Sequence, residues 1–332
     1  MQRFHSGGAH RPAGTVTDAL IAKAVALLRA GQVVALPTET VYGLGADALN
    51  PAAVARIFAL KGRPAEHPLI VHLPPDEPLE NWAASVPEAA RALARAFWPG
   101  PLTMILARGA RVPKAVTGGQ DTVALRVPDH PVALALLRAF GSGIAAPSAN
   151  RFGHISPTTA AHVRAEFGDA VPLILDGGPC RVGLESTIVD LSRGAPVVLR
   201  PGAIGAADIA RVIGSAAMTD GATAAGPAPR VSGLLARHYA PRTPAELVES
   251  AALPGRLAEL AALGQSVGVL ALGRTVGQNC IALPDDPAAY GQGLYAALRE
   301  LDGRGFSCLL VEAPPRDESW RAVNDRLQRA VA

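Results

Sequence analysis

The sequence predicts a mixed α/β protein with two globular parts. Short apolar segments of strand length alternate with amphipathic helical segments from about residue 17 to residue 213. A stretch of mainly Ala, Gly, Pro and Thr at 215–230 interrupts this alternation, which resumes beyond residue 245. A chain of 332 residues is long enough for two domains of this kind. The expected division is an N-terminal tail at 1–16, a larger α/β domain at 17–213, a linker at 214–244 and a small C-terminal α/β domain of Rossmann-like character at 245–332.

The larger domain opens with a helix and a strand. Thr17 can cap a helix whose apolar positions share one face, and Gly31 can end it. Residues 33–36 follow as a strand, and Asn50 before Pro51 predicts the start of a second helix. This helix is expected to run to about residue 60. Further strands are expected at 69–73, 102–107, 123–127, 173–176 and 187–191, and further helices at 88–97, 131–139 and 159–167.

The C-terminal part repeats the alternation. Strands are expected at 266–272 and 308–311, with a helix at 288–301 between them. Near the end, Trp320, Val323 and Leu327 lie at helical spacing and predict a last helix. The stretch at 215–230 has almost no side chain to bury, so a flexible linker is expected there.

Composition excludes several classes of protein. Hydrophobic residues make up 49% and charged residues 18%, which excludes general disorder. No run reaches the roughly 20 apolar residues of a membrane-spanning helix, and residues 1–17 lack the apolar core of a leader, so a cytoplasmic protein is expected. Cys180, Cys280 and Cys308 form no CxxC pair, which argues against a disulfide scaffold or a zinc site. A net charge of +3 fits an anionic ligand but is too small to predict nucleic-acid binding.

Polar segments directly after strands are the first candidates for a binding site. At 37–45, the hydroxyl groups of Thr38 and Thr40, together with glycines that let the backbone approach a ligand, suit the recognition of a small polar substrate. An ordinary capped turn explains the same residues equally well.

Two further pairs are predicted from the geometry of extended chain. Pro64 favours an extended conformation at Arg63, and residues two apart then point the same way, so Lys61 and Arg63 could face one anion. The alternative is a solvated helix end, where basic residues are favoured by the helix dipole. The same spacing would place Ser148 and Asn150 on one side of a pocket.

Several single residues add to this picture. Arg126 lies inside an apolar run and, if buried, needs an anionic partner from the protein or from a ligand. Arg200 adds a cation at a strand end, whereas helix capping alone would explain Ser156 or Thr158. Cys180 has no histidine nearby in sequence and is interpreted as a plain thiol. No P-loop, no GxGxxG after a strand and no metal-spaced His or Cys cluster is present, so no protein-bound metal is expected.

Taken in order, these segments resemble the YrdC/Sua5 family of threonylcarbamoyl-AMP synthases. His238-Tyr239-Ala240-Pro241 also resembles the motif of the longer Sua5 branch, which adds a C-terminal domain. The other matching motifs are Pro37–Gly45 (PTETVYGLG), Lys61–Pro64 (KGRP), Pro68–His72 (PLIVH), Trp98–Thr103 (WPGPLT), Ala146–Asn150 (APSAN), Glu185–Ile188 (ESTI) and Leu199–Gly202 (LRPG).

The resemblance implies a fold and a reaction. The fold would be a YrdC-like twisted mixed sheet, with helices around a central, positively charged cavity. The reaction would convert L-threonine, bicarbonate and ATP into threonylcarbamoyl-AMP and diphosphate, an intermediate for the t6A modification of adenosine 37 in tRNAs that read ANN codons. A downstream tRNA threonylcarbamoyl transferase complex would be the partner, and Mg²⁺ is expected with ATP.

The resemblance also assigns residues. It implies L-threonine binding at Thr40, His72, Arg126, Ala146 and Ser186. It implies ATP binding at Arg63, His67, Thr122, Ser148, Ser156, Arg200 and Tyr239, with His67 standing where some members carry Asn. It implies a set central to activity at Lys61, Arg63, Ser148 and Asn150. Because Tyr239 comes from the linker, that segment is expected to fold over the cavity as a lid.

Two other functions remain open at this stage. A regulator that binds double-stranded RNA or tRNA through the basic cavity is one, although the chain has no Lys/Arg run and few aromatic residues for base stacking. The other is carbamoyl adenylation of a different acceptor, as in YrdC-like modules of hydrogenase maturation proteins, which carry zinc-finger cysteines that this chain lacks. The C-terminal domain could serve packing or oligomerisation, or it could have a regulatory or partner-docking role.

Overall fold

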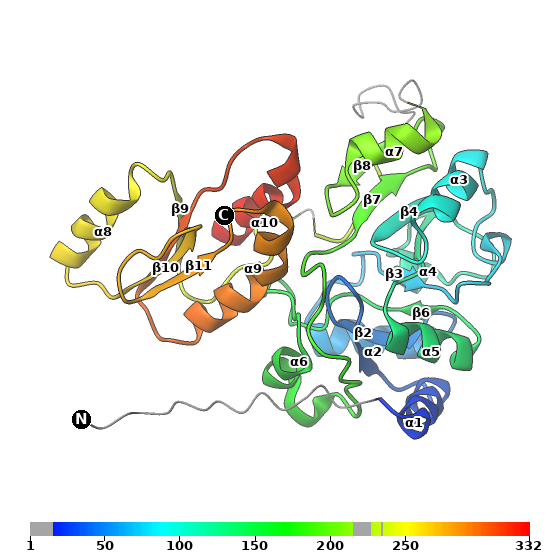
Figure 1. Ribbon diagram of the computed structural model, residues 1–332. Coiled ribbons are helices and arrows are strands. Elements are labelled where there is room, and N and C mark those ends of the chain that lie inside the picture. Colours follow the sequence, from blue (N-terminus) through cyan, green and yellow to red (C-terminus); the bar gives the residue numbers. More distant parts are fainter. Residues whose placement is uncertain (1–15, 215–226, 234) are drawn as a thin grey trace.

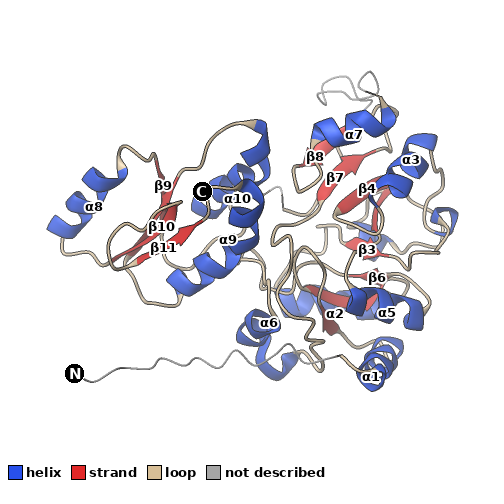
Figure 2. Ribbon diagram, in the orientation of Figure 1, coloured by secondary structure: helices blue, strands red, loops and turns tan. Residues whose placement is uncertain are grey.

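The computed structural model describes residues 16–214, 227–233 and 235–332. It contains an eight-stranded mixed sheet in the N-terminal part and a separate four-stranded parallel sheet in the C-terminal part (Figures 1 and 2). The predicted mixed α/β class and the small second α/β unit are confirmed. Most of the expected tail and of the linker stretch at 215–230 lies outside the described residues. Among the helices described, none is long and apolar enough to cross a membrane.

The large sheet curls around its own concave face, with strand order β1-β2-β6-β3-β5-β4-β7-β8. Only the β3–β5 and β4–β7 pairs are parallel, and the remaining neighbours are antiparallel. The strands are β1 (Val34–Leu36), β2 (Gly43–Asp47), β3 (Ile70–His72), β4 (Leu102–Ala107), β5 (Thr122–Arg126), β6 (Ile144–Ala145), β7 (Thr187–Asp190) and β8 (Val197–Arg200).

Helices pack against this sheet; α1, α2, α3, α5 and α6 start at or within one residue of the predicted positions, whereas α4 and α7 were not predicted. Thr17 caps α1, and the Asn50 side chain accepts hydrogen bonds from the first amides of α2, where Pro51 occupies the first turn. Gly62 ends α2 in the left-handed conformation, at φ 61°. The helices are α1 (Asp18–Arg29), α2 (Pro51–Lys61), α3 (Glu88–Phe97), α4 (Lys114–Thr117), α5 (Pro131–Phe140), α6 (Ala160–Phe167) and α7 (Ala206–Ile213).

Two sequence expectations in this domain are wrong. The predicted strand at 173–176 is only a single bridge to Ala35, because the chain turns away at Asp176–Gly178 after two backbone hydrogen bonds. Part of the predicted polar loop at 37–45 is instead strand β2. Its glycines are required by packing, since a Cβ at Gly45 would lie 2.8 Å from a Leu36 methyl group.

The C-terminal sheet is parallel, with order β11-β10-β12-β9. Alternate residues of its strands face opposite sides: Leu270 packs with α9 and α10, and Val269 packs with α8. Figure 1 shows α9 and α10 on the side that faces the larger domain, with α8 on the far side. The elements are β9 (Ala245–Val248), α8 (Leu253–Ala262), β10 (Val267–Leu272), β11 (Cys280–Leu283), α9 (Pro287–Asp302), β12 (Cys308–Glu312) and α10 (Arg321–Val331).

Candidate functional site

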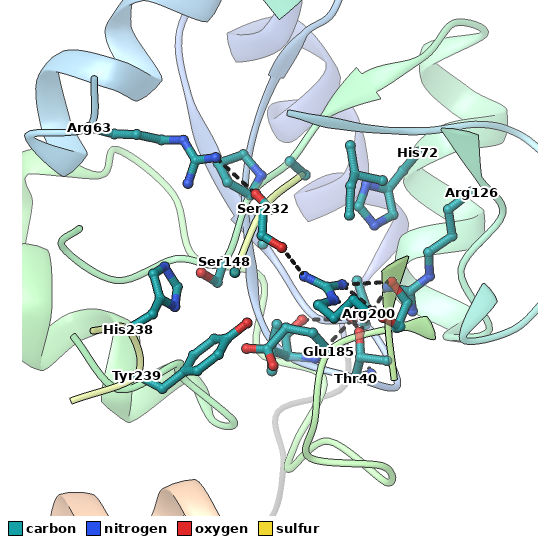
Figure 3. A pocket seen from close by; sticks show the side chains of 18 residues that line it. Thr40, Arg63, His72, Arg126, Ser148, Glu185, Arg200, Ser232, His238 and Tyr239 are labelled. Atoms are coloured by element: carbon teal, nitrogen blue, oxygen red, sulfur yellow. Dashed lines mark hydrogen bonds between the residues drawn. The ribbon is translucent and has the colours of Figure 1, made fainter. Parts of the chain in front are cut away.

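A small enclosed pocket lies on the concave face of the large sheet (Figure 3). It is lined by strand ends, by the loops after β1 and β6, by the loop before β7 and by the described end of the linker. Its free volume is about 40 Å³, room for only a few water molecules, since one water needs roughly 10–15 Å³ on the same measure. Its polar lining consists of Thr38, Thr40, Arg63, His72, Arg126, Ser148, Glu185, Ser186, Arg200, Ser232, His238 and Tyr239.

The deep end of the pocket is built around Arg126 at the end of β5. Its guanidinium forms a buried ion pair with Glu39 at 2.6 Å and donates to the Thr40 hydroxyl at 3.0 Å and to the Gly100 carbonyl at 3.2 Å. The anionic partner expected for a buried Arg126 is therefore a protein carboxylate. An arginine has five N–H donors, so two remain for a ligand.

His72 ends β3 on the same wall of the pocket. Burial, and next the nearby Arg126, lower the pKa of its imidazole to about 3, so the ring is neutral near pH 7. Its Nδ1 atom is buried without a hydrogen-bond partner among the described residues. A neutral ring with an unpartnered nitrogen can serve a polar ligand without adding charge.

We expect the free energy of unfolding to fall as the pH is lowered below about 6.5, the pKa of histidine in an unfolded chain. From there down to the folded pKa of about 3, the unfolded chain binds a proton that His72 in the folded chain does not. For this one group, each pH unit of acidification then lowers the free energy of unfolding by up to about 1.4 kcal/mol. Urea titrations at about pH 7.5 and about pH 5 should show a smaller acid loss for His72→Gln than for the unmodified chain. An equal loss in both would contradict this account.

Ser186 and Arg200 form the floor beside β7 and β8. The Ser186 hydroxyl shares a hydrogen bond with the Thr103 hydroxyl at 2.7 Å. Arg200 is fully buried and donates to the Ser186 carbonyl at 2.8 Å and to its hydroxyl at 3.1 Å. Burial lowers the pKa of the Arg200 guanidinium from its ordinary value.

The described end of the linker closes the outer side of the pocket. Arg63 donates to the Ser232 hydroxyl at 2.9 Å, and Arg200 donates to the Ser232 carbonyl at 2.9 Å (Figure 3). Burial lowers the pKa of Arg63 to about 10, which still leaves it charged near pH 7. Ser232 thus accepts hydrogen bonds from both guanidinium groups.

Tyr239 reaches the pocket from the HYAP motif, and its backbone is held at φ 62°, a conformation that non-glycine residues rarely adopt. Its hydroxyl is buried without a partner among the described residues, and burial, followed by Glu185, raises its pKa to about 12. Edge-to-face contacts join Tyr239 to His238 at 4.2 Å and His238 to Phe152 at 6.1 Å. These ring contacts therefore hold the motif in place, while the Tyr239 hydroxyl points into the pocket.

Lys61 lies near the pocket for a different reason from the predicted one. It is the last residue of α2, so the extended geometry that was to align it with Arg63 is absent. Its ammonium group is buried and donates to the carbonyls of Ser148 and Asn150, at 2.5 Å each. Burial, and next the nearby Arg63, hold the pKa of Lys61 well below its usual value. The lysine braces the loop that presents Ser148.

The predicted common orientation of Ser148 and Asn150 is also wrong. Ser148 lines the pocket, whereas the buried Asn150 amide turns away and donates to the carbonyls of Arg151 and His154. The backbone carbonyls of both residues meet at Lys61 instead.

Three residues that the resemblance assigns to ATP lie beside the lining. His67 contacts Phe152 edge to face at 5.3 Å, and Thr122 lines a separate small cleft that shares Ser232 with the pocket. Ser156 donates to Glu185 at 2.6 Å, so its role here is not helix capping; Thr159 caps α6. The resemblance-assigned residues that do line the pocket are Thr40, Arg63, His72, Arg126, Ala146, Ser148, Ser186, Arg200 and Tyr239.

Sequence reasoning missed the groups that complete the site. Glu39 and Glu185 were seen only as parts of motifs, yet each is a buried carboxylate paired with a distant arginine. The signal was the presence of two acidic residues in segments that otherwise read as ligand-binding loops. Ser232 and Gly233 carried no signal, because nothing in the linker sequence says where it docks.

The described residues hold no cluster of three His, Cys, Asp or Glu side chains that could bind a metal ion. Glu185 is the one carboxylate in the described lining, and Ser156, Tyr295 and Arg326 already donate to it. This donor set does not fit a Mg²⁺ ion held by the protein. Cys180 is buried, and burial raises its pKa to about 12, in agreement with a plain thiol.

The C-terminal sheet shows no second anion site of this kind in its described residues. In parallel α/β sheets, ligands bind beyond the carboxyl ends of strands. Here the buried Glu312 ends β12, accepts from the Leu272 amide at 3.0 Å and pairs with Arg274 at 2.9 Å. A carboxylate at that position disfavours a phosphate.

A curled mixed sheet whose concave face gathers cations, hydroxyls and unpartnered buried polar atoms is typical of a protein that binds a small anionic ligand. Comparison with known proteins gives the family. The family model described as "Telomere recombination", Sua5/YciO/YrdC, matches residues 26–202, and the model for the threonylcarbamoyl-AMP synthase C-terminal domain matches residues 204–332. The chain belongs to the Sua5/YrdC family, in its long Sua5 form.

Relatives resemble the chain over nearly its whole length. The threonylcarbamoyl-AMP synthase of Pyrococcus abyssi is 42% identical, with 92% of each chain covered, and that of Bacillus subtilis is 40% identical, with 96% of this chain and 94% of the relative covered. The crystal structure of P. abyssi Sua5 complexed with L-threonine matches with a TM-score of 0.84 and 40% identity over 94% of each chain. A doubly substituted variant of the same protein matches with a TM-score of 0.88 and 38% identity over 96% of this chain and 95% of that one.

Proposed function

We propose that this chain makes threonylcarbamoyl-AMP and diphosphate from L-threonine, bicarbonate and ATP. The observation that supports this most directly is the ring of buried polar atoms around the pocket that have no partner among the described residues. They are the Arg63 Nε, His72 Nδ1, His238 Nδ1 and Tyr239 hydroxyl atoms. Unpaired buried polar groups are costly, so their gathering at one cavity favours a polar ligand there. Relatives named threonylcarbamoyl-AMP synthase support the particular reaction.

The deep end of the pocket is the proposed threonine site. The two remaining donors of Arg126 bind the carboxylate, which does not displace Glu39. Thr40, Ser186 and the neutral His72 surround the rest of the amino acid. The amine then attacks the carbon of bicarbonate, and loss of water leaves a carbamate.

The outer end is the proposed triphosphate site. Arg63 and Arg200 compensate phosphate charge while a carbamate oxygen attacks the α-phosphorus and the bond to diphosphate breaks. Lys61 acts through the loop that carries Ser148. Mg²⁺ is proposed only as a companion of ATP, because the described lining of the pocket offers it no free carboxylate.

The linker is the proposed lid. A free volume of about 40 Å³ cannot hold the substrates, and Ser232 occupies Arg63 and Arg200. Entry of ATP therefore requires residues 231–233 to move, and their return excludes water during the reaction. Turnover and the ATP KM of Tyr239→Ala test this lid: if neither changes, the idea fails.

We expect Gly233→Ala to lower kcat/KM for ATP by between about tenfold and 100-fold, because small misplacements at a reacting site have effects of this size. A Cβ at Gly233 would lie 2.1 Å from the Tyr239 hydroxyl and 3.3 Å from Arg200. The matched control is Gly119→Ala, which has nearly the same φ, 83° against 84°, but nothing within 4 Å of the new Cβ. Steady-state kinetics check this. Equal effects in the two variants would mean that backbone strain alone, and not the contact with Tyr239, explains the loss.

Diphosphate release from ATP tests the function itself. It should require L-threonine and bicarbonate together, and mass spectrometry should detect threonylcarbamoyl-AMP. Release that does not depend on threonine would overturn the proposal. Tight RNA binding without any release would favour the RNA-binding regulator, which the enclosed position of the cations supports less well. We further propose that the chain acts in the cytoplasm and supplies a tRNA threonylcarbamoyl transferase complex, with at most weak RNA binding of its own.

A further inference from the structure

The C-terminal domain reaches the pocket through one buried side chain, Arg326 of α10. Its side chain has 0% exposure, and its Nε donates to the Glu185 carboxylate at 2.8 Å. Its Nη2 donates to the carbonyls of Glu185, at 3.3 Å, and Pro201, at 3.0 Å. The two partners are 141 residues apart in sequence. This contact joins the second domain to the wall that also carries Ser186.

The contact with Arg326 matters because Glu185 places a carboxylate at the pocket. Its carboxylate lines the pocket, within electrostatic reach of Arg200. Burial alone would raise its pKa, but Arg326 and then Arg200 outweigh burial, so the pKa lies below its ordinary value and the group is charged near pH 7. A charged carboxylate in that position repels phosphate, and it competes for the arginines that should bind phosphate.

The C-terminal domain supplies two of the three side-chain donors to Glu185. The Tyr295 hydroxyl of α9 donates at 2.9 Å, and Arg326 also lies over the ring of Tyr239 at 5.4 Å. Within the described residues, no carboxylate lies within ion-pair distance of Arg63 or Arg200. Both cations therefore keep their charge available to a ligand while Glu185 is held by Arg326.

We propose that Arg326 is a positioning residue for ATP: by pairing with Glu185, it keeps that carboxylate from pairing with Arg200, so that the Arg200 charge can serve a phosphate once Ser232 moves away, and it makes the C-terminal domain part of the nucleotide site. This inference rests on the proposed function. It assigns the C-terminal domain an electrostatic task in addition to packing. The threonine end does not depend on it, because Arg126 has its own partner in Glu39.

The experiment measures the effect of one substitution on ATP and on threonine separately. Arg326→Met should raise the KM for ATP by roughly tenfold or more, the scale for loss of one partner of a buried charge pair, and should change the KM for threonine much less. Calorimetric binding of ATP without threonine should weaken to the same extent. The control is Arg321→Met on the same helix, whose exposed side chain pairs with Glu318 and leaves both constants unchanged.

A rescue variant distinguishes electrostatics from simple loss of structure. Arg326→Met combined with Glu185→Gln removes both charges and should recover most of the lost ATP affinity. If Arg326→Met does not fold, Tyr295→Phe removes one donor to Glu185 and keeps the ring, and ATP binding should still weaken measurably.

The inference fails if ATP and threonine constants move together, if folded Arg326→Met binds ATP as the unmodified chain does, or if the double variant gives no recovery. Failure of the proposed function shows itself separately, as absence of threonine-dependent diphosphate release from the unmodified chain. ATP binding by calorimetry then still decides the role of Arg326.

Discussion

Replacing Arg126 by methionine is expected to abolish threonine-dependent turnover and to destabilise the fold at the same time. The substitution leaves the Glu39 carboxylate buried, with the Asp129 amide, at 3.0 Å, as its one remaining donor among the described residues. Breaking a buried pair in this way typically costs about 3–5 kcal/mol of unfolding free energy. The proposed carboxylate donors also disappear, so kcat/KM for threonine should fall by at least about 100-fold. Urea titration and diphosphate release measure the two effects.

A second substitution separates these effects. Arg126→Met with Glu39→Gln removes the stranded charge, so the unfolding free energy should recover while threonine-dependent turnover stays lost. Arg95→Met, which breaks the exposed pair with Glu88, is the control and should leave stability nearly unchanged. If activity returned with stability in the double variant, Arg126 would be a structural residue and the threonine site would lie elsewhere.

Much of the fold could be predicted from local sequence. Periodicity and capping located α2, because Asn50 and Pro51 act within one turn of the helix that they begin. Strand β2 was missed because its glycines have low strand propensity, and only its pairing between β1 and β6 makes it a strand. The false strand at 173–176 is the reverse case, an apolar run that finds almost no pairing partner.

The sequence predicted which residues belong to the site better than it predicted how these residues interact. Several polar segments lie at the ends or beginnings of strands of one sheet, and this brings Thr40, Arg126 and Ser186 together. The contacts that set their charges join residues far apart in the chain, such as Glu185 with Arg326, and no local pattern encodes them. Lys61 shows the difference, because an extended chain was expected to align it with Arg63, whereas it ends helix α2 and its ammonium group donates to the Ser148 carbonyl.

The second large effect is expected at Arg63, where methionine should remove ATP binding and leave threonine binding intact. Arg63 donates to Ser232 and to the Pro68 carbonyl at 2.9 Å each, and its Nε atom is buried without a partner among the described residues. A guanidinium with free donors and no ion-pair partner is suited to phosphate. Loss of one preorganised donor group of this kind typically costs about 10²–10³-fold in rate. Arg56→Met, at an exposed position of α2, the helix that ends two residues before Arg63, is the control.

The variant Arg63→Lys tests whether a positive charge alone is enough for ATP binding. Lysine keeps the positive charge but not the planar set of donors, so it should restore only part of the ATP affinity. Threonine binding measured without ATP should stay the same in all these variants, because Arg63 and Arg126 contact different partners at opposite ends of the pocket (Figure 3). If Arg63→Met weakened threonine and ATP equally, the pocket would be a single undivided site, and the assignment of one cation to each substrate would have to be abandoned.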